Sequence, residues 1–182
     1  MQGIASPRDD QAPASAVTLR PVRPEDMEFL FRVYASTRDD EMTLLDWSSA
    51  EKQTFLRMQF HAQHQYYHAQ FRDARFDVIE RDAQPVGRLY VDRRADTINI
   101  IDIALLPEHR RVGIGSLLLR ALLAEANASG LSVSIHVERK NPALRWYERQ
   151  GFVRVSDQGI YYFMRWSPAP ISENPVRHRA AE

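Results

Sequence analysis

Leu105-Leu-Pro-Glu-His-Arg-Arg-Val-Gly-Ile-Gly115 separates a strand-like run, Ile98–Leu105, from a helix-like run, Ser116–Glu125. Glycines let a backbone come close to a ligand, and the first N–H groups of a helix have no partner within it. The helix dipole adds roughly half a positive charge at that end, which favours anions. Arg110 and Arg111 can add charge-assisted hydrogen bonds. The pattern predicts a phosphate-binding loop, with a tight turn carrying solvated arginines as the plain structural alternative.

Two common nucleotide-binding motifs do not fit these residues. A P-loop requires Gly-Lys-Ser or Gly-Lys-Thr, which does not follow the loop. A dinucleotide-binding fingerprint requires a third glycine, but Leu118 stands at that position. The loop therefore needs a second motif before its ligand can be named.

Composition narrows the class of protein. The 182 residues suffice for one domain with a sizeable core, and 44% hydrophobic and 26% charged residues are typical of a soluble protein. Basic and acidic side chains balance at 24 each, so neither nucleic acid nor an anionic membrane is expected as a partner. Because the chain has no cysteine, thiol chemistry and cysteine-ligated metals are excluded. With no apolar run of about 18 residues, a cytoplasmic location is expected.

The expected domain is Val17–Trp166, between a flexible N-terminal tail, Met1–Ala16, and a flexible C-terminal tail, Ser167–Glu182. Hydrophobic periodicity and turn residues predict the elements within it. In chain order they are a strand at Val17–Arg20, helices at Glu25–Thr37 and from Ser48 or Ser49 to about Phe71, strands at Phe76–Arg81, Pro85–Val91 and Thr97–Leu106, a helix to about Ser129 ended by Gly130, a strand at Leu131–Val137, a short helix opened by Asn141-Pro142, and a hairpin of Phe152–Val155 with Ile160–Trp166.

The order β-α-α-β-β-β-α-β-α-β-β predicts an α/β protein with a mixed sheet of the α+β type. The strands at Thr97–Leu106 and Leu131–Val137 are expected to be parallel, because a helix joins them. Arg38–Trp47 is expected to be irregular, and its acidic run Asp39–Glu41 either attracts a cationic amine or is simply solvated.

A second motif follows the predicted parallel strand: Asn141-Pro-Ala-Leu-Arg-Trp-Tyr-Glu-Arg-Gln-Gly-Phe152. Together with the loop it resembles the GCN5-related N-acetyltransferase (GNAT) superfamily. That family's acetyl-CoA loop, Arg/Gln-x-x-Gly-x-Gly/Ala, is matched by Arg110, Gly113 and Gly115. Its later Asn, helical Tyr and Gly-Phe are matched by Asn141, Tyr147, Gly151 and Phe152. The resemblance covers Val17–Trp166 in element order and is specific from Asp102 to Phe152.

The resemblance implies a GNAT fold in which two parallel central strands splay apart, with the pantetheine arm of acetyl-CoA between them as an added strand. It implies backbone contacts to that arm from Ile103, Ala104 and Leu105. It assigns the pyrophosphate to Arg110, Arg111, Val112, Gly113, Ile114, Gly115 and Ser116. Asn141 matches an asparagine near the pantetheine arm, and it can equally be the N-cap of the helix that follows.

The resemblance also implies catalytic roles. Tyr147 matches the usual general acid, which protonates the departing thiolate, and its structural alternative is a buried aromatic. His136 stands where one branch of the family has a glutamate base, and its alternative is a half-buried strand histidine. The rivals for the base are Glu138, Glu80, Asp102 and a chain of water molecules.

Three histidines of the second predicted helix, His61, His64 and His68, share one face. That spacing can ligate zinc, but no fourth ligand is evident. No metal is therefore expected, and the helix is interpreted as a solvated polar face or as a wall of the acceptor site.

The predicted function is transfer of an acetyl group from acetyl-CoA to a primary amine of a small molecule or peptide, directly in a ternary complex. The alternatives are a non-catalytic CoA-binding or interaction module and a transferase of longer acyl groups. The acceptor does not follow from the fold. A homodimer is compatible with the aromatic surface of the last hairpin, which carries Tyr161, Tyr162, Phe163 and Trp166.

Overall fold

The computed structural model describes residues 16–168, which divide into two compact units. The first unit comprises residues 16–70, 75–90 and 102–114. The second comprises residues 71–74, 91–101 and 115–168. The predicted tails, Met1–Ala16 and Ser167–Glu182, lie outside the described residues except for Ala16, Ser167 and Pro168.

Seven strands form a hydrogen-bonded series in the order β1-β2-β3-β4-β5-β7-β6. Their bounds are β1 (Val17–Pro21), β2 (Arg75–Arg81), β3 (Gln84–Arg93), β4 (Thr97–Leu105), β5 (Ser132–Glu138), β6 (Val153–Gln158) and β7 (Tyr161–Trp166). Strand β4 pairs with β5 in parallel, whereas β1 with β2, β5 with β7 and β6 with β7 are antiparallel. The predicted mixed α/β architecture and its parallel crossover are confirmed.

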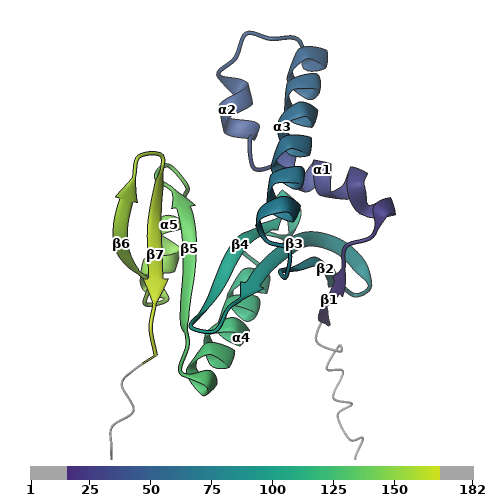
Figure 1. The fold of residues 1–182 in the computed structure, drawn as a ribbon. Coiled ribbons are helices and arrows are strands. Elements are labelled where there is room, and N and C mark those ends of the chain that lie inside the picture. Colours follow the sequence, from purple (N-terminus) through teal and green to yellow (C-terminus); the bar gives the residue numbers. More distant parts are fainter. Residues whose placement is uncertain (1–15, 169–182) are drawn as a thin grey trace, which may run out of the picture. The chain divides into compact units, whose positions relative to one another are not determined.

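The first unit carries three α-helices: α1 (Met27–Ala35), α2 (Asp39–Thr43) and α3 (Ser49–Gln70), shown in purple and blue in Figure 1. A short 3-10 turn, η1 (Pro24–Asp26), precedes α1, so the helix predicted from Glu25 becomes α-helical two residues later. The core joins α1 to α3 and β2 through Phe29, Leu30, Phe31, Val33, Tyr34, Leu56, Phe60 and Val78. Phe60 meets the rings of Phe31 and Tyr34 at 5.9 and 5.8 Å, and such pairs add about 0.5–1.5 kcal/mol each beyond area burial.

The start of α3 is set by Ser48 and Glu51. The Ser48 N–H donates to Glu51 Oε2 at 2.8 Å, and the Glu51 N–H donates to Ser48 Oγ at 3.3 Å. This reciprocal capping box satisfies two donors that the helix leaves without partners. The expected cap is therefore confirmed at Ser48.

The segment Arg38–Trp47, expected to be irregular, contains helix α2. Acidic side chains at Asp39, Asp40 and Glu41 occupy its first turn, where the helix dipole favours negative charge. Arg38 also pairs with Glu41 at 3.0 Å, three residues along. The acidic run thus has a local structural role that hydrophobic periodicity did not reveal.

Strands β2 and β3 are joined by a two-residue turn, Asp82-Ala83. Both residues have left-handed φ values, 52° and 61°, as a type I′ hairpin turn requires. The connection between the strands predicted at Phe76–Arg81 and Pro85–Val91 is therefore this turn, and Gln84 already belongs to β3.

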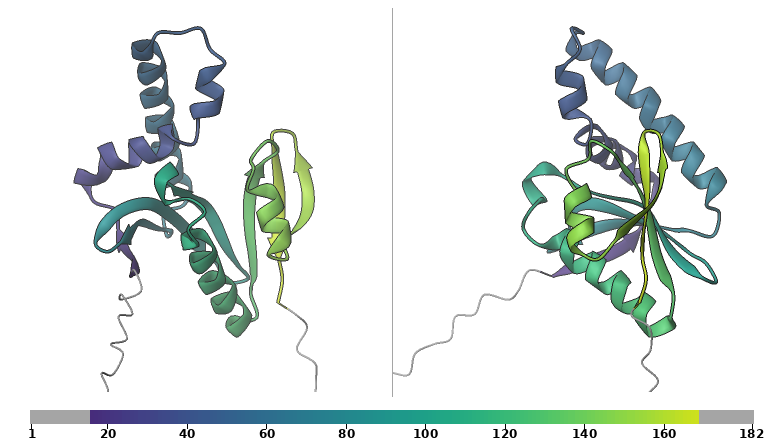
Figure 2. Two further views of the ribbon diagram at one scale, coloured as in Figure 1. Left: turned by 180° about the vertical axis from the view of Figure 1, so that it is seen from behind. Right: turned by 90° about the vertical axis from the view of Figure 1, so that its left-hand side faces the viewer.

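The second unit holds most of helix α4 (Ile114–Ser129) and the short helix α5 (Leu144–Arg149). Gly130 follows α4 with φ 67°, as expected for the residue that ends a helix. Helix α5 lies on one face of β5, β7 and β6, behind them in Figure 1 and in front of them in the reverse view of Figure 2. None of the helices in residues 16–168 is both long and apolar enough to cross a membrane.

Candidate functional site

The loop after β4 turns through two left-handed residues directly before helix α4. A 3-10 turn, η2 (Pro107–His109), is followed by extended Arg110, left-handed Arg111 at φ 59° and Gly113 at φ 93°. Such turns present successive N–H groups to one side, and α4 begins at the next residue, Ile114. A side chain at position 113 would meet nothing within 4 Å, so its φ, and not crowding, requires glycine there.

The two arginines of the loop differ in their surroundings. Arg110 donates from Nε to the Leu105 carbonyl at 2.8 Å, and from Nη2 to the Ser36 carbonyl at 3.1 Å and Ser36 Oγ at 2.9 Å. Arg111 is exposed, and its side chain makes no hydrogen bond or ion pair within residues 16–168. Of the two predicted anion ligands, Arg111 is exposed, whereas three N–H groups of Arg110 are bound by the protein.

The remaining predicted loop contacts fall into two groups. The Ile114 side chain is buried, so only its backbone can meet a ligand, whereas Val112 is exposed. At Gly115 an added Cβ would lie 4.0 Å from Trp146 Cη2, an ordinary van der Waals distance. The protein's own packing therefore leaves room for a methyl group at Gly115, and Ser116 beside it is half-buried.

The last residues of β4, Ile103–Leu105, are half-buried and lie close to β3. A Cβ added to Gly87 of β3 would stand 2.3 Å from the Ala104 carbonyl oxygen, which no side chain tolerates. In the second unit, the register of β4 with β5 covers Thr97–Ile100 against Ser132–Ile135, and both strands continue past these positions. The backbone predicted to hold the pantetheine arm lies beyond that paired stretch.

Tyr147 is a packed aromatic of α5, with 4% of its surface exposed. Its ring lies 4.7 Å from that of Trp146 and 5.5 Å from that of Phe152. At Gly151, with φ 92°, an added Cβ would approach Trp166 of β7 to 3.2 Å, so glycine permits α5 to end close against the strand. The structural interpretation of Tyr147 is thus correct, and it is compatible with a catalytic hydroxyl.

His136 lies on the opposite face of the same strands from α5. Residues paired across neighbouring strands point to the same face of a sheet, so Ile135 shares a face with Met164, and Met164 shares it with Arg154. Arg154 donates a hydrogen bond of 2.6 Å to Glu148 of α5, so this face is the one that α5 covers. The next pair, His136 with Phe163, points the other way, with the rings 4.9 Å apart. His136 is exposed, and Glu138 shares its face as the two-residue alternation predicted.

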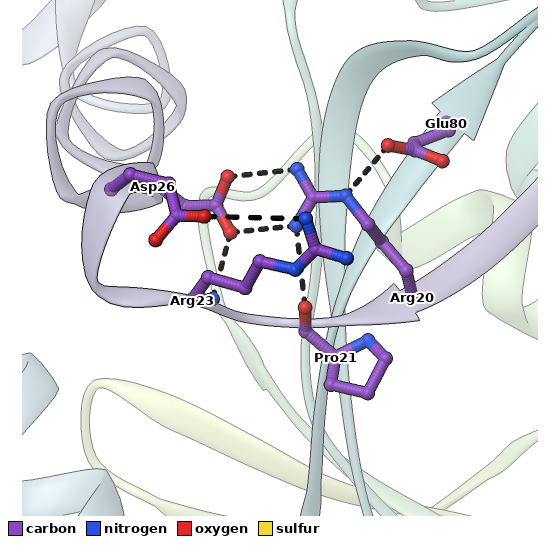
Figure 3. A network of polar contacts seen from close by, with 6 residues as sticks. Arg20, Pro21, Arg23, Asp26 and Glu80 are labelled. Atoms are coloured by element: carbon purple, nitrogen blue, oxygen red, sulfur yellow. Dashed lines mark hydrogen bonds and ion pairs between the residues drawn. The ribbon is translucent and has the colours of Figure 1, made fainter.

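The rival bases Glu80 and Asp102 both form ion pairs in the first unit. Glu80 accepts from Arg20 Nε at 2.6 Å, and Arg20 also holds Asp26 through two hydrogen bonds of 2.7 and 2.8 Å (Figure 3). The hydrogen bond from Arg20 lowers the pKa of Asp26 against the opposing effect of burial. Asp102 accepts from Arg88 Nη2 at 2.7 Å. Glu80 thus belongs to the network that anchors the start of α1 on β1.

The prediction that Asn141 is the N-cap of the following helix is wrong, because the N-cap of α5 (Leu144–Arg149) is Ala143. Asn141 Oδ1 accepts the Ala143 N–H at 2.8 Å, and the Asn141 carbonyl accepts the Leu144 N–H at 3.0 Å. The expectation that Asn141-Pro142 opens the helix directly is corrected, because α5 begins at Leu144 and the turn before it uses the asparagine oxygen. The side-chain amide nitrogen remains the atom through which Asn141 can meet a ligand.

The three histidines of α3 are drawn into aromatic packing. His68 stacks on Phe76 at 4.1 Å, and His64 lies 4.4 Å from His68. Burial, followed by repulsion from neighbouring cations, lowers the pKa of His64. Within the described residues no group of three or more His, Asp or Glu side chains is placed to hold a metal ion.

Sequence reasoning missed Arg88 and Tyr90, which are 3% and 2% exposed beneath the helices of the first unit. Arg88 Nη2 bonds Gln63 Oε1 at 3.0 Å as well as Asp102, and its guanidinium lies 5.4 Å from the Tyr90 ring centre. A signal was present in the alternation of β3, which puts positions 86, 88 and 90 on one buried face.

Comparison with known proteins agrees with this geometry. The model of the Acetyltransferase (GNAT) family matches residues 40–152. Among solved structures, the chain is similar to the PaiA N-acetyltransferase of Thermoplasma acidophilum in complex with coenzyme A, with 19% identity, TM-score 0.63, and coverage of 84% of this chain and 99% of that one.

Two further solved structures show the same fold. Naa50 of Arabidopsis thaliana with the bisubstrate analogue CoA-Ac-MVNAL has 16% identity, TM-score 0.56, and coverage of 83% and 98% of the two chains. The ribosomal-protein-S18-alanine N-acetyltransferase of Escherichia coli has 18% identity, TM-score 0.56, and coverage of 87% and 98%. No curated protein sequence matches the chain. Because the family match spans more than half of its residues, the protein belongs to the GNAT family of acetyltransferases.

Proposed function

We propose that this protein is an acetyl-CoA-dependent N-acetyltransferase that acts on a primary amine of a small molecule or a peptide. The observation that carries the proposal is the loop between β4 and α4, where two left-handed residues, Arg111 and Gly113, lead directly into the N-terminus of a helix, an arrangement that suits an anion. Membership of the GNAT family supports the donor, as does the coenzyme A complex of a structural relative.

In this proposal the loop holds the pyrophosphate of acetyl-CoA. Backbone N–H groups of residues 111–116 and the exposed Arg111 guanidinium supply the hydrogen bonds, and Gly115 gives the phosphates room to approach. The backbone of Ile103–Leu105 and the Asn141 amide contact the pantetheine arm. These assignments follow the family pattern, and the open surroundings of Gly115 and Arg111 support them.

The proposed chemistry is direct transfer. The amine nitrogen attacks the thioester carbon, a C–N bond forms, and the carbonyl oxygen becomes an oxyanion. The C–S bond then breaks and restores the carbonyl, while the Tyr147 hydroxyl gives its proton to the departing sulfur. The proton lost by the amine passes to His136, directly or through water, and solvent reprotonates Tyr147. An acyl-cysteine intermediate is impossible because the chain has 0 cysteines.

The placement of His136 and Tyr147 on opposite faces of β5, β7 and β6 suits these two roles. Proton removal takes place on the nitrogen side of the reacting carbon, and proton donation takes place on the sulfur side.

The test combines binding and turnover. Isothermal titration with acetyl-CoA should show binding, and thiol release from acetyl-CoA should be measured across small amines, amino acids and peptides with free N-termini. Propionyl-CoA run in parallel reports on longer acyl groups. No binding of acetyl-CoA between micromolar and millimolar concentrations would overturn the proposal, and binding without thiol release from any acceptor would leave a non-catalytic CoA-binding module.

A further inference from the structure

The Arg110 side chain forms hydrogen bonds with the end of strand β4 and with the end of helix α1, two segments that are far apart in the sequence. Its Nε donates to the carbonyl of Leu105, the last residue of β4, and its Nη2 donates to the carbonyl and Oγ of Ser36, the residue that ends α1. Three of the five N–H groups of a guanidinium are therefore used within the first unit. The Arg110 side chain is therefore held at one side by the end of β4 and at the other by the residue after α1.

The partners of Arg110 are groups that need a donor. A carbonyl at the end of a helix has no partner within the helix, and a cation there also complements the negative end of the dipole. Ser36 Oγ donates its own hydrogen to the Val33 carbonyl at 2.8 Å, so it is free to accept from Arg110. Each of the three hydrogen bonds therefore has a defined donor and acceptor.

We propose that Arg110 is a positioning residue that couples the acetyl-CoA loop to the connection between α1 and α2, so that acetyl-CoA bound at the loop orders that connection. The inference rests on the proposed function, because it takes acetyl-CoA as the ligand of the loop. Arg111, adjacent in sequence but without a protein partner in residues 16–168, supplies charge to the ligand instead.

The physical basis is linkage through local opening. The Arg110 contacts hold the base of the loop in one conformation, because the side chain reaches back to Leu105 and Ser36 from the residue directly after η2, and left-handed Arg111 follows it. A ligand that selects this conformation reduces the frequency with which the contacts open, by a factor of up to 1 + [L]/Kd. The amides around Ser36 then open less often, although none of them touches the ligand.

Hydrogen–deuterium exchange of the full-length protein, with and without acetyl-CoA, tests the coupling. At about 100 times the Kd, exchange in a peptide covering residues 34–45 should slow by up to about 100-fold. Arg110→Ala, kept saturated with acetyl-CoA, should lose this slowing in residues 34–45 while the loop peptide stays protected. Arg110→Lys should restore little of this slowing, because one ammonium group cannot donate to Leu105 and Ser36 at the same time as the planar guanidinium does.

Arg111→Ala is the matched control. It should weaken acetyl-CoA binding and flatten the dependence of log Kd on log salt, but at saturation it should keep the protection of residues 34–45. Equal slowing in Arg110→Ala, or no slowing in the wild-type protein with acetyl-CoA bound, would overturn the coupling while leaving the proposed function intact. A flattened salt dependence in Arg110→Ala equal to that of Arg111→Ala would instead make Arg110 a phosphate ligand.

A double-mutant cycle adds a second readout. Ser36→Ala removes one of the three acceptors without touching the loop, so it should weaken acetyl-CoA binding in the wild-type background only. In the Arg110→Ala background the same change should have no further effect on Kd. Additive effects of the two substitutions would show that Arg110 does not act through Ser36, whereas failure of the wild-type protein to bind acetyl-CoA would remove the proposed function itself.

Discussion

Arg88 and Asp102 form an ion pair of 2.7 Å in which the arginine side chain is 3% exposed and the carboxylate 15%. Burying a cation costs several kcal/mol unless its charge and its N–H groups are matched. Asp102 matches the charge, and Gln63 accepts a second hydrogen bond from the same nitrogen, Nη2. Asp102 is therefore required by Arg88, which argues against its role as a free catalytic base.

Removing Asp102 alone should be far more damaging than removing the pair. Asp102→Ala leaves the Arg88 cation buried without its carboxylate partner, and should cost about 3–5 kcal/mol. The double variant Arg88→Met/Asp102→Leu should recover most of that loss, since apolar groups of similar volume often replace a buried pair without penalty. Denaturant unfolding of the two variants and the wild type measures both the loss and its recovery. A cost below about 1 kcal/mol for Asp102→Ala would show that the pair is not effectively buried.

Tyr90 should make the protein sensitive to alkaline pH. Its hydroxyl is buried without a hydrogen-bond partner among the described residues, and burial raises its pKa to about 12 although nearby Arg88 opposes the shift. Since the folded pKa lies above the unfolded value of about 10, the stability contribution is present below pH 10 and is lost as the pH rises toward 12. The loss amounts to about 2–3 kcal/mol.

Tyr90→Phe isolates this contribution. It removes a buried hydroxyl that has no partner, so the stability at neutral pH should stay the same or rise by about 1 kcal/mol. The fall in unfolding free energy between pH 10 and 12 should shrink by comparison with the wild type. An unchanged alkaline profile in Tyr90→Phe would assign the transition to another group.

Two glycines of the loop should respond oppositely to alanine. Gly113→Ala forces a side chain into φ 93° and should cost about 1–2 kcal/mol of stability. Gly115→Ala meets only Trp146 at 4.0 Å and should be neutral or stabilising, because alanine favours the helix by up to about 1 kcal/mol. Acetyl-CoA binding should survive Gly115→Ala, because the family pattern accepts alanine at this position, whereas the larger side chain of Gly115→Val should weaken it by occupying space proposed for the phosphates. Wild-type affinity in Gly115→Val, measured by titration calorimetry, would show that the phosphates do not approach there.

The contrast between Gly113 and Arg110 shows what sequence could and could not predict. Backbone requirements are local, so glycine spacing, the Ser48 cap and the Gly130 helix end were visible in the chain itself. The parallel crossover also followed from element order, because a helix between strands β4 and β5 dictates it. Contacts between side chains that are far apart in the sequence could not be predicted. Arg110 contacts Ser36, 74 residues away, and the sequence alone gives no reason to expect either side chain to be anything but solvated.

Helix α2 and the Arg88 cluster were missed for two different physical reasons. Helix α2 has no fully buried residue, so it leaves no hydrophobic periodicity, and it is favoured by its acidic first turn and by the Arg38–Glu41 ion pair. Arg88 lies on a strand face where apolar residues are the usual occupants, and its burial depends on Gln63 and Asp102, contributed by two other elements. Such compensation between distant polar residues appears only once the chain is folded.

His136 and Glu138 can be separated as proposed bases by their pH–rate profiles. Both lie on the same face of β5, and His136 is exposed beside Phe163. His136→Gln should remove the acidic limb of the kcat/KM profile and lower kcat/KM by about 100-fold or more, while acetyl-CoA binding stays unchanged. Glu138→Gln, the matched control on the same strand face, should keep the limb. If both variants retain it, water is the direct proton acceptor and His136 is only a strand residue.

Tyr147→Phe tests the proposed acid with little structural change. The substitution keeps the ring contacts with Trp146 and Phe152, so the fold and the acetyl-CoA affinity should stay close to those of the wild type. Loss of the proton donor to sulfur should lower kcat by about 10²–10⁴-fold. A substrate with a better leaving group than the CoA thiolate needs less protonation, so an acetyl thioester of an aromatic thiol should lose much less rate. Equal losses for both thioesters, measured by thiol release, would mean that the Tyr147 hydroxyl positions α5 or the donor and does not protonate the sulfur.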